Sequence, residues 1–377
     1  MREALKLAEL GLGSVSPNPM VGCVIVRNDR IVGRGHHRRY GECHAEVAAI
    51  ADAGRRARGA TMYVTLQPCN HFGKTPPCTD AVIRSGVKQV VIAARDTNPK
   101  TMCDAGLLRI RAAGIRVKTG VCEQEARRQN EVYFHNLEYQ RPFVALKLAA
   151  TLDGMIADAR GRSKWITGPE ARARVQLLRA KYDAVLVGAG TVQADNPRLT
   201  CRMPGKRHPV RVVLDHSLGI SPRFRLLSCP GRTIIFCSER VPVRKRQRLI
   251  SDKVEVIPVK SGTVPVSFRE TRGCPKSFRG LSPFQCRRSW HEVLAALDER
   301  RIASVLVEGG AQVAASALKA RVVSKLYLFL APRILGSGVS FSAGLGAVDL
   351  NQAIPLSEWQ TESVGSDLLV SGYPQED

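Results

Sequence analysis

Strand and helix signals alternate along this chain, and the alternation occurs twice. In the first part, the helical stretch 45–53 is followed by the apolar run 62–66. In the second part, the apolar run 143–150 is followed by the helical stretch 175–181. Alternation of this kind is typical of domains in which helices cover a β-sheet. We therefore expect an α/β fold in both parts of the chain.

A proline indicates where the two parts meet. A polar, helix-prone stretch at 123–138 is followed by Arg141-Pro142, and a proline disfavours helical backbone in the residue before it. The chain has 377 residues, which is enough for two or three well-buried cores. We expect a first domain at residues 1–142 and a second at residues 143–377.

The charge balance narrows the class of ligand. Lysine and arginine number 57 against 33 acidic residues, a formal net charge of +24, which favours phosphorylated ligands, nucleic acid or anionic membranes. Thirteen of the basic residues, with only three acids, lie between residues 240 and 290. No sustained period runs through 261–288, so we expect 240–290 to be a basic surface insertion, partly without regular structure. A solvated loop and a nucleic-acid contact both remain open for it.

Cysteine usage and hydropathy indicate the compartment. Eleven cysteines are scattered along the chain, which favours metal binding or buried thiols in a reducing compartment over a disulfide framework. No run of about 18 apolar residues occurs, and residues 1–11 are typical of an amphipathic helix rather than a signal peptide. We expect a soluble cytoplasmic protein with no membrane contact.

A histidine, a glutamate and two cysteines in the first domain form the pattern of a zinc site. His44 and Glu46 stand at the start of a helical stretch, and Cys69 and Cys78 follow with eight residues between them. One imidazole and two thiolates leave a fourth zinc position open for water. A glutamate two residues after the histidine is the general acid/base of zinc deaminases. We therefore predict one Zn²⁺ held by His44, Cys69 and Cys78, with Glu46 as the catalytic residue.

The surrounding motifs resemble one enzyme family. Residues 16–19, 21–26, 44–46, 63–78 and 96–99 closely resemble RibD, the bifunctional deaminase/reductase family of riboflavin biosynthesis. The resemblance implies a three-layer, cytidine-deaminase-like fold and hydrolytic deamination of 2,5-diamino-6-ribosylamino-4(3H)-pyrimidinone 5′-phosphate. It also implies a set of residues that line the pyrimidine and phosphate pocket: Asn18, His37, His71, Lys74, Asp96 and Asn98. Two alternatives remain open, a turn role for Asn18 and a solvated Lys74.

Three positions depart from the family pattern. Gln67 stands where the family usually has a glutamate, Cys43 directly precedes His44, and Cys103 stands where a glycine is usual. A carboxylate that could orient a zinc ligand is therefore missing at position 67. This leaves open that the deaminase is impaired and that the chain acts mainly as a reductase.

The second domain resembles the reductase part of the same family, through residues 146–154, 163–167, 175–179, 191–200 and 307–310. The resemblance implies a dihydrofolate-reductase-like α/β fold and reduction of the ribosyl group to a ribityl chain, with NADPH as cofactor. The implied cofactor contacts are Ala149, Trp165, Thr191, Asp195, Gly310, Ala311, Gln312, Val313, Ala314, Ala315 and Ser316. The implied substrate contacts are Ser163, Arg179, Leu199, Arg202 and Glu308.

Elementary chemistry supports part of this set. Gly309-Gly310 leads into a helix, and the free amides and dipole at a helix N-terminus favour a pyrophosphate. The guanidinium groups of Arg179 and Arg202 would suit a phosphate, and the alternative that either is a surface arginine stays open. Two further alternatives also stay open: Glu308 could cap the following helix, and Trp165 could belong to the core. His216 replaces a small hydroxyl residue at a cofactor-side position.

The sequence thus predicts a bifunctional enzyme that first deaminates and then reduces a small phosphorylated pyrimidine, and we expect it to form a homo-oligomer. A basic nucleic-acid-binding deaminase is the rival class, because of the charge excess in 240–290. No recognisable nucleic-acid module accompanies that charge, so we expect no nucleic-acid partner.

Overall fold

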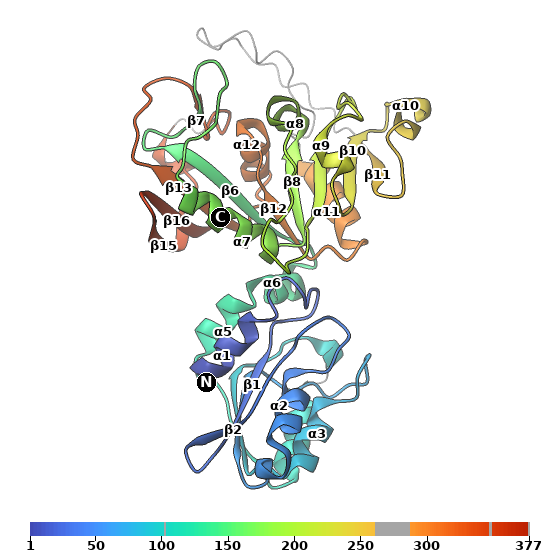
Figure 1. Cartoon of the computed structure of the whole chain (residues 1–377), viewed down its shortest axis with the longest axis vertical. Helices are drawn as coiled ribbons and strands as arrows, with labels where there is room; N and C mark the ends of the chain where they lie inside the picture. Colours follow the sequence, from blue (N-terminus) through green and yellow to red (C-terminus); the bar gives the residue numbers. More distant parts are fainter. Residues whose placement is uncertain (102, 261–286, 347–348, 376–377) are drawn as a thin grey trace. The chain divides into compact units, whose positions relative to one another are not determined.

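The computed structural model describes residues 1–101, 103–260, 287–346 and 349–375. The chain divides into two compact units, Met1–Gln140 and Arg141–Asp377 (Figure 1). The division falls after residue 140, against the expected 142. In the described residues, no helix is both long and apolar enough to cross a bilayer.

The first unit is built on a five-stranded sheet with the order β2-β1-β3-β4-β5. Strand β1 (Gly22–Arg27) pairs antiparallel with β2 (Arg30–His36) and β3 (Thr61–Leu66). Strands β3, β4 (Gln89–Ala94) and β5 (Arg116–Lys118) are parallel. Strand β2 was not expected. The Asn28-Asp29 turn that creates it has φ of 48° and 56°, the positive values that a tight two-residue hairpin loop requires.

Helices cover both faces of this sheet, so the unit has three layers (Figure 1). Its helices are α1 (Arg2–Glu9), α2 (Ala45–Ala53), α3 (Cys78–Ser85), α4 (Cys103–Ala112), α5 (Glu123–Gln129) and α6 (Glu131–Tyr139), with 3₁₀ turns at Gly54–Ala57 and Pro99–Thr101. Helices α2, α3 and α4 bury Ala49, Val82 and Ile110 in one core, while Ala126 of α5 is buried with Leu66 in another.

A glycine brings α2 close to the sheet. A Cβ at Gly35 in β2 would lie 2.3 Å from the carbonyl oxygen of Ala45 and 2.4 Å from the nitrogen of Ala49. Any larger residue would therefore push α2 away from the sheet. Since the motif residues His44 and Glu46 stand at the start of α2, this close approach also sets their depth.

The second unit contains a nine-stranded sheet with the order β11-β10-β9-β8-β12-β6-β13-β16-β15. Its strands are β6 (Phe143–Thr151), β8 (Ala184–Gly188), β9 (Val210–Leu214), β10 (Thr233–Ser238), β11 (Val254–Val259), β12 (Ser304–Val307), β13 (Lys325–Ala331), β15 (Leu356–Val364) and β16 (Asp367–Pro374). The strands from β11 to β13 are parallel, and β16 and β15 continue antiparallel. A separate ribbon pairs β7 (Met155–Ala157) with β14 (Val339–Ser340).

Several helices of the second unit begin at the carboxyl edge of the parallel strands. The helices are α7 (Pro169–Lys181), α8 (Ala189–Asp195), α9 (Arg225–Ser228), α10 (Val243–Gln247), α11 (Arg287–Asp298) and α12 (Ala311–Lys319), with a 3₁₀ turn at Leu350–Gln352. Helices α8, α10 and α12 follow β8, β10 and β12 directly, and Figure 1 shows them at the same end of the strands. Ligands of open parallel sheets bind at this edge.

The structure differs from the expectation for residues 240–290 at both ends of that segment. Strand β11 joins the sheet through parallel pairing with β10, and Trp290 of α11 is fully buried beside Val293 and Leu294. The charge of the surrounding segment hid the strand: Val254, Val256, Ile257 and Val259 are apolar, but Lys253 and Lys260 flank them in a stretch that was judged by its basic residues. The expectation for 261–286 lies outside the described residues.

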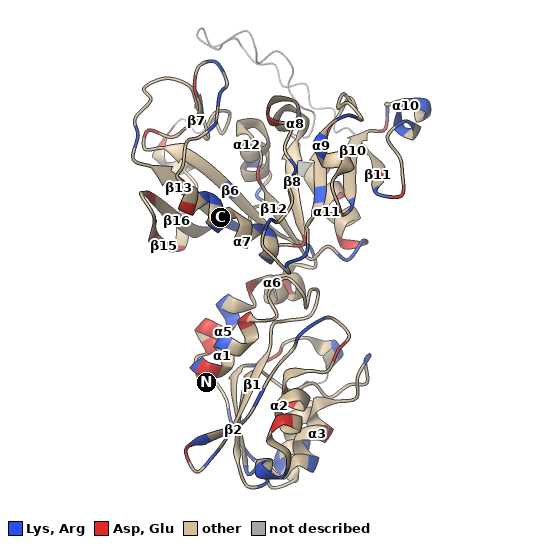
Figure 2. Ribbon diagram, viewed as in Figure 1, with Lys and Arg blue, Asp and Glu red and all other residues tan. Residues whose placement is uncertain are grey.

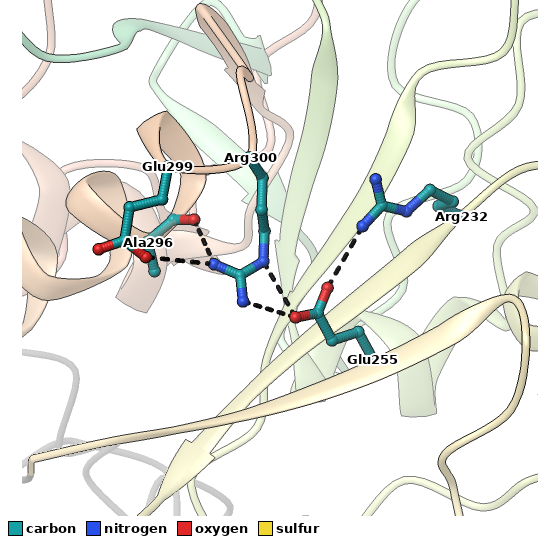
Figure 3. Close-up of polar contacts among 5 residues, drawn as sticks. All are labelled: Arg232, Glu255, Ala296, Glu299 and Arg300. Carbon is teal, nitrogen blue, oxygen red and sulfur yellow. Dashed lines mark hydrogen bonds and ion pairs between the residues drawn. The ribbon is translucent and has the colours of Figure 1, made fainter.

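An ion cluster ties the edge strand β11 to α11 (Figure 3). The carboxylate of Glu255 accepts from Arg300 Nε at 3.0 Å and Nη2 at 2.5 Å, and from Arg232 Nη2 at 3.3 Å. Arg300 also donates to the carbonyl of Ala296 at 2.7 Å. The hydrogen bond from Arg300 lowers the pKa of Glu255, burial opposes it, and the nearby positive charges lower the pKa further.

This cluster predicts a small, pH-dependent contribution to stability. Glu255→Gln should lower the free energy of unfolding by up to about 1 kcal/mol at pH 7, because the pair is partly solvent-exposed. A lowered native pKa stabilises the fold above the unfolded pKa of about 4.3, and the contribution is lost as pH falls through the native pKa. Urea unfolding at pH 7 and pH 3 measures this difference.

Glu299→Gln is the matched control. The Glu299 side chain is 76% exposed and approaches Arg300 only to 3.7 Å, so its loss should leave the unfolding curve unchanged. An equal cost for Glu255→Gln at both pH values would contradict the electrostatic account.

Candidate metal centre and second site

Three side chains of the first unit meet in the geometry of a metal site. The ligand atoms of His44, Cys69 and Cys78 lie within 4.8 Å of one another. His44 Nδ1 is 3.1 Å from the Cys78 sulfur and 3.6 Å from the Cys69 sulfur. Zinc bonds of about 2.0 Å to nitrogen and 2.3 Å to sulfur at tetrahedral angles would place such atoms about 3.6 Å apart. The three residues therefore fit one zinc ion.

Local structure positions each of the three. His44 is the N-cap of α2, Cys78 is the first residue of α3, and Cys69 lies in the loop after β3. The backbone N–H and the hydroxyl of Thr79 both donate to the carbonyl of Cys69, at 3.1 Å and 3.0 Å. These two bonds hold the start of α3 against the Cys69 loop, and the N-terminal end of a helix favours a thiolate.

Glu46 is a buried carboxyl beside the cluster. It lies on the first turn of α2 and is only 3% exposed. Burial raises its pKa to about 7, and the neighbouring Cys69 thiolate raises it too. The hydrogen bond from Cys78 lowers the pKa of Cys69, and the same hydrogen bond raises the pKa of Cys78.

The cluster opens into a cavity of about 530 Å³. Each of the substrate residues expected in the first domain lines it: Asn18, His37, His71, Lys74, Asp96 and Asn98. They come from separate loops, which the sheet brings to one edge. Tyr133 of α6 also lines the cavity, and sequence reasoning missed it because a tyrosine in a polar helix carries no motif.

Hydrogen bonds fix the state of His37. Its Nδ1 donates to the carbonyl oxygen of Cys43 at 3.1 Å, which leaves Nε2 to accept from the amide of Asn18 at 3.2 Å. Burial lowers the pKa of His37, in agreement with a neutral ring. Asn18 thus orients His37, so its side chain does more than form the turn that was the alternative.

Asp96 and Tyr133 form a second polar group that lines the cavity. The Tyr133 hydroxyl donates to Asp96 at 2.9 Å and accepts from Asn98 Nδ2 at 3.3 Å. Gln67 is buried, and its Oε1 accepts from the backbone N–H of Asp96 at 3.3 Å. The glutamine therefore anchors this loop, and the three metal ligands keep their geometry with it in place.

The remaining predicted residues of the first unit are more exposed. Lys74 is an exposed residue at the cavity, and its ammonium lies 4.2 Å from the centre of the Tyr40 ring. The His71 Nδ1 atom is buried, and no described residue gives it a hydrogen-bond partner. Cys43 is exposed, and the side chain of Cys103 lies outside the described residues.

In the second unit, two predicted substrate residues pair with each other. Arg179 Nε and Nη2 donate to the two carboxylate oxygens of Glu308 at 2.7 Å and 2.9 Å, and Nη1 donates to the carbonyl of Thr200 at 3.2 Å. Both side chains are largely buried. Burial alone would raise the pKa of Glu308, but Arg179 and Lys147 lower it more, so Glu308 stays ionised. The helix-capping alternative for Glu308 is therefore wrong.

Lys147 belongs to the same group and was missed by the sequence analysis. It projects from β6, burial lowers its pKa, Glu308 raises it, and Arg179 lowers it. A lysine inside the otherwise apolar strand 143–151 was the available signal, because a buried lysine needs a specific partner.

The starts of two helices lie side by side where a pyrophosphate was expected. A Cβ at Gly310 would lie 3.6 Å from the Thr191 hydroxyl, so the starts of α12 and α8 are close together. Val313 fills the space beside Gly188 and Gly309, where a Cβ would come within 2.8 Å and 2.6 Å of its side chain. These two glycines therefore let Val313 of α12 pack closely against the strand ends, and Gly310 is the N-cap of α12, where free amides favour an anion such as a pyrophosphate.

The other predicted cofactor and substrate residues differ in their exposure and in their contact partners. Trp165 is 64% exposed, which excludes the core alternative, and the Arg172 guanidinium lies 4.6 Å from its ring. Asp195 forms an ion pair with Lys164 at 3.0 Å. Leu199 is buried, Arg202 is exposed, Ser163 and Ala149 are half-buried, and Gln312 lies on the first turn of α12.

The residues 310–316, which were predicted to contact the cofactor, do not all lie where a cofactor could reach them. Ala311, Ala314 and Ala315 are buried, and the Ser316 hydroxyl accepts from the Trp290 indole at 3.1 Å inside the core. Only the start of α12 is therefore placed to meet a cofactor, and Ser316 packs the sheet.

A His/Cys/Cys cluster beside a buried glutamate, on a three-layer α/β unit, defines the class of zinc-dependent deaminases. Sequence comparison agrees: the family described as the cytidine and deoxycytidylate deaminase zinc-binding region matches residues 1–94. The RibD C-terminal domain family matches residues 142–370.

Relatives align along nearly the whole chain. A riboflavin biosynthesis protein RibD from Aquifex aeolicus is 39% identical over 371 residues, covering 98% of this chain and 96% of the relative. The Escherichia coli RibD is 38% identical over 350 residues, 89% of this chain and 88% of the relative. A crystal structure of a Thermotoga maritima diaminohydroxyphosphoribosylaminopyrimidine deaminase/5-amino-6-(5-phosphoribosylamino)uracil reductase is 40% identical, with a TM-score of 0.83 and coverage of 100% and 97%. The chain belongs to the RibD family.

The metal geometry predicts which thiols hold zinc. Cys69→Ala and Cys78→Ala should each reduce bound zinc from about one ion per chain by roughly ten-fold or more, because three protein ligands are the minimum for a catalytic site. Elemental analysis of protein purified without chelators measures the content. Cys43→Ala removes the exposed neighbouring thiol and should keep its zinc. Equal loss in all three variants would contradict the assignment.

Proposed function

We propose that this enzyme carries out two consecutive steps of riboflavin biosynthesis. The first is hydrolytic deamination of 2,5-diamino-6-ribosylamino-4(3H)-pyrimidinone 5′-phosphate, and the second is NADPH-dependent reduction of the ribosyl group to a ribityl chain. The observation that carries the proposal is the cluster of His44, Cys69 and Cys78 beside buried Glu46, in a chain that aligns with RibD over both units.

In the deaminase, His44, Cys69 and Cys78 would hold the zinc ion. Bound zinc supplies Lewis acidity, which lets a water ionise near neutral pH. Glu46 would accept the proton of the attacking water and deliver it to the departing amine. The neutral His37 and its partner Asn18 can orient a pyrimidine ring, and Lys74 can donate to an anionic oxygen.

In the reductase, the contacts divide between cofactor and substrate. The amides at the start of α12, with Thr191, Ala149, Trp165 and Asp195, would hold NADPH, which supplies hydride when bound. Arg179, Glu308 and Lys147 form a buried charged group that can orient a polar substrate and hold a proton. Ser163, Leu199 and Arg202 complete the proposed substrate contacts.

The order of the two steps has a direct test. Purified enzyme supplied with the diaminopyrimidinone phosphate alone should release ammonia, and NADPH should be oxidised only after that release. Ultraviolet absorbance and an ammonia assay follow both steps. NADPH oxidation without ammonia would mean that the first unit is inactive, the outcome that Gln67 left open.

Replacing the proposed proton carrier separates the two activities. Glu46→Gln should lower ammonia release by about 10³-fold or more, because the amide cannot take up the proton. Oxidation of NADPH with the already deaminated compound should be unchanged. Zinc content should also be unchanged, which distinguishes lost chemistry from lost metal. Wild-type rates of deamination in this variant would overturn the assignment.

We also propose a reducing, cytoplasmic setting and a homo-oligomeric state. All the cysteines that the structure describes are free thiols, which is the state expected in a reducing compartment. Size-exclusion chromatography with light scattering tests the oligomer.

A further inference from the structure

Helix α6 reaches the cavity of the first unit through one side chain, Tyr133. The N-cap residue of α6, Asn130, is buried and fixes the start of the helix. Its amide oxygen accepts from the backbone N–H of Met20 at 2.7 Å, and its amide nitrogen donates to the carbonyl of Met20 at 2.9 Å. Since Tyr133 lies one turn further along, these two bonds also set the place of its side chain.

The two ends of the Tyr133 side chain have different surroundings. Its ring packs against the small apolar core that contains Leu66 and Ala94. Its hydroxyl donates to Asp96 Oδ1 at 2.9 Å and accepts from Asn98 Nδ2 at 3.3 Å, and both of these residues line the cavity. The ring therefore holds the hydroxyl at a fixed place at the edge of the cavity.

The hydroxyl belongs to a set of bonds that orients two side chains of the loop after β4. Asp96 Oδ1 also accepts from the backbone N–H of Asn98 at 3.0 Å. Asn98 Oδ1 accepts from the backbone N–H of Lys100 at 3.0 Å, so the amide of Asn98 presents its nitrogen to Tyr133. The Tyr133 hydroxyl is the group that connects the carboxylate and the amide to a helix outside their own loop.

The charges of the neighbouring helices show what α6 offers to the carboxylate. Helix α5 carries acidic residues in its first turn and basic residues in its last turn (Figure 2). Helix α6 contains no lysine or arginine, and it meets Asp96 with a neutral hydroxyl. A neutral donor orients a carboxylate without cancelling its negative charge. The diaminopyrimidinone phosphate has N–H and O–H groups that can donate to such an acceptor.

We propose that Tyr133 is a positioning residue of the deaminase, whose hydroxyl holds Asp96 and Asn98 in the orientation that binds the pyrimidine substrate. The inference rests on the proposed deamination and adds to it a residue that no motif indicated. Tyr133 acts through its two partners and takes no part in the proton transfer assigned to Glu46. Its loss therefore weakens substrate binding and leaves the zinc ligands and the chemical step in place.

Steady-state kinetics of ammonia release by the full-length enzyme test the proposal. Tyr133→Phe removes only the hydroxyl and keeps the ring in its core. It should raise KM for the diaminopyrimidinone phosphate by about ten-fold and leave kcat within about two-fold, because a hydrogen bond to a charged group is lost from binding. Zinc content, the unfolding curve and NADPH oxidation with the already deaminated compound should be unchanged.

Tyr139→Phe is the matched control. It removes a hydroxyl from the same helix, but Tyr139 is 49% exposed and does not line the cavity. This variant should have the kinetics of the wild type.

A second experiment tests whether Tyr133 acts through Asp96. In the Glu46→Gln background, which should bind the substrate without turning it over, calorimetry measures the affinity directly. Adding Tyr133→Phe should weaken binding by about ten-fold. Adding it to a chain that already carries Asp96→Ala should weaken binding by less than about three-fold, because only the longer bond to Asn98 is left to lose.

Three results would overturn the inference while the proposed function stands. They are an unchanged substrate affinity in Tyr133→Phe, an equal loss in Tyr139→Phe, and losses from Tyr133→Phe and Asp96→Ala that multiply as independent effects. A wild-type enzyme that releases no ammonia would instead overturn the proposed deamination itself.

Discussion

The metal site of the first unit depends on the contact between Thr79 and Cys69. The backbone N–H and the hydroxyl of Thr79 both donate to the carbonyl of Cys69. They join the loop after β3 to the start of α3, and so they bring two sulfurs that are distant along the loop to one imidazole. The close packing of α2 against Gly35 positions the remaining residues of the site, because it sets the depth of His44 and Glu46. The metal site is thus a consequence of how two helix starts are docked on one sheet edge.

In the second unit, the parallel sheet plays the corresponding role. Helices α8, α10 and α12 all begin at the carboxyl edge of its strands, so that free amides and basic loops are collected along one line. The buried group of Arg179, Glu308 and Lys147 follows the same logic, since Glu308 comes directly after β12 and Lys147 lies on its neighbour β6. Burying any one of these charges alone would cost free energy, and burying opposite charges together offsets that cost.

Local patterns predicted these elements unevenly. Strands β9 and β12 and helix α2 have the bounds that periodicity alone indicated, because their burial is decided by short apolar runs. Strand β11 was missed because its apolar residues, Val254, Val256, Ile257 and Val259, lie in a segment whose basic residues dominated the interpretation. The same reason explains why a stretch judged by its charge was expected to be a surface insertion.

Sequence by itself determined the chemistry of the deaminase: the ligand types, their order and the glutamate two residues after the histidine are all carried by local motifs. Only the tertiary structure decided that Asn18 orients His37, that Tyr133 joins Asp96, that Arg179 pairs with Glu308 and that Lys147 enters the same group. It also decided that Ser316 packs the core. The physical reason is that a motif specifies which atoms are offered, whereas the partner of each side chain depends on the pairing of strands far apart in the chain, which no local pattern encodes.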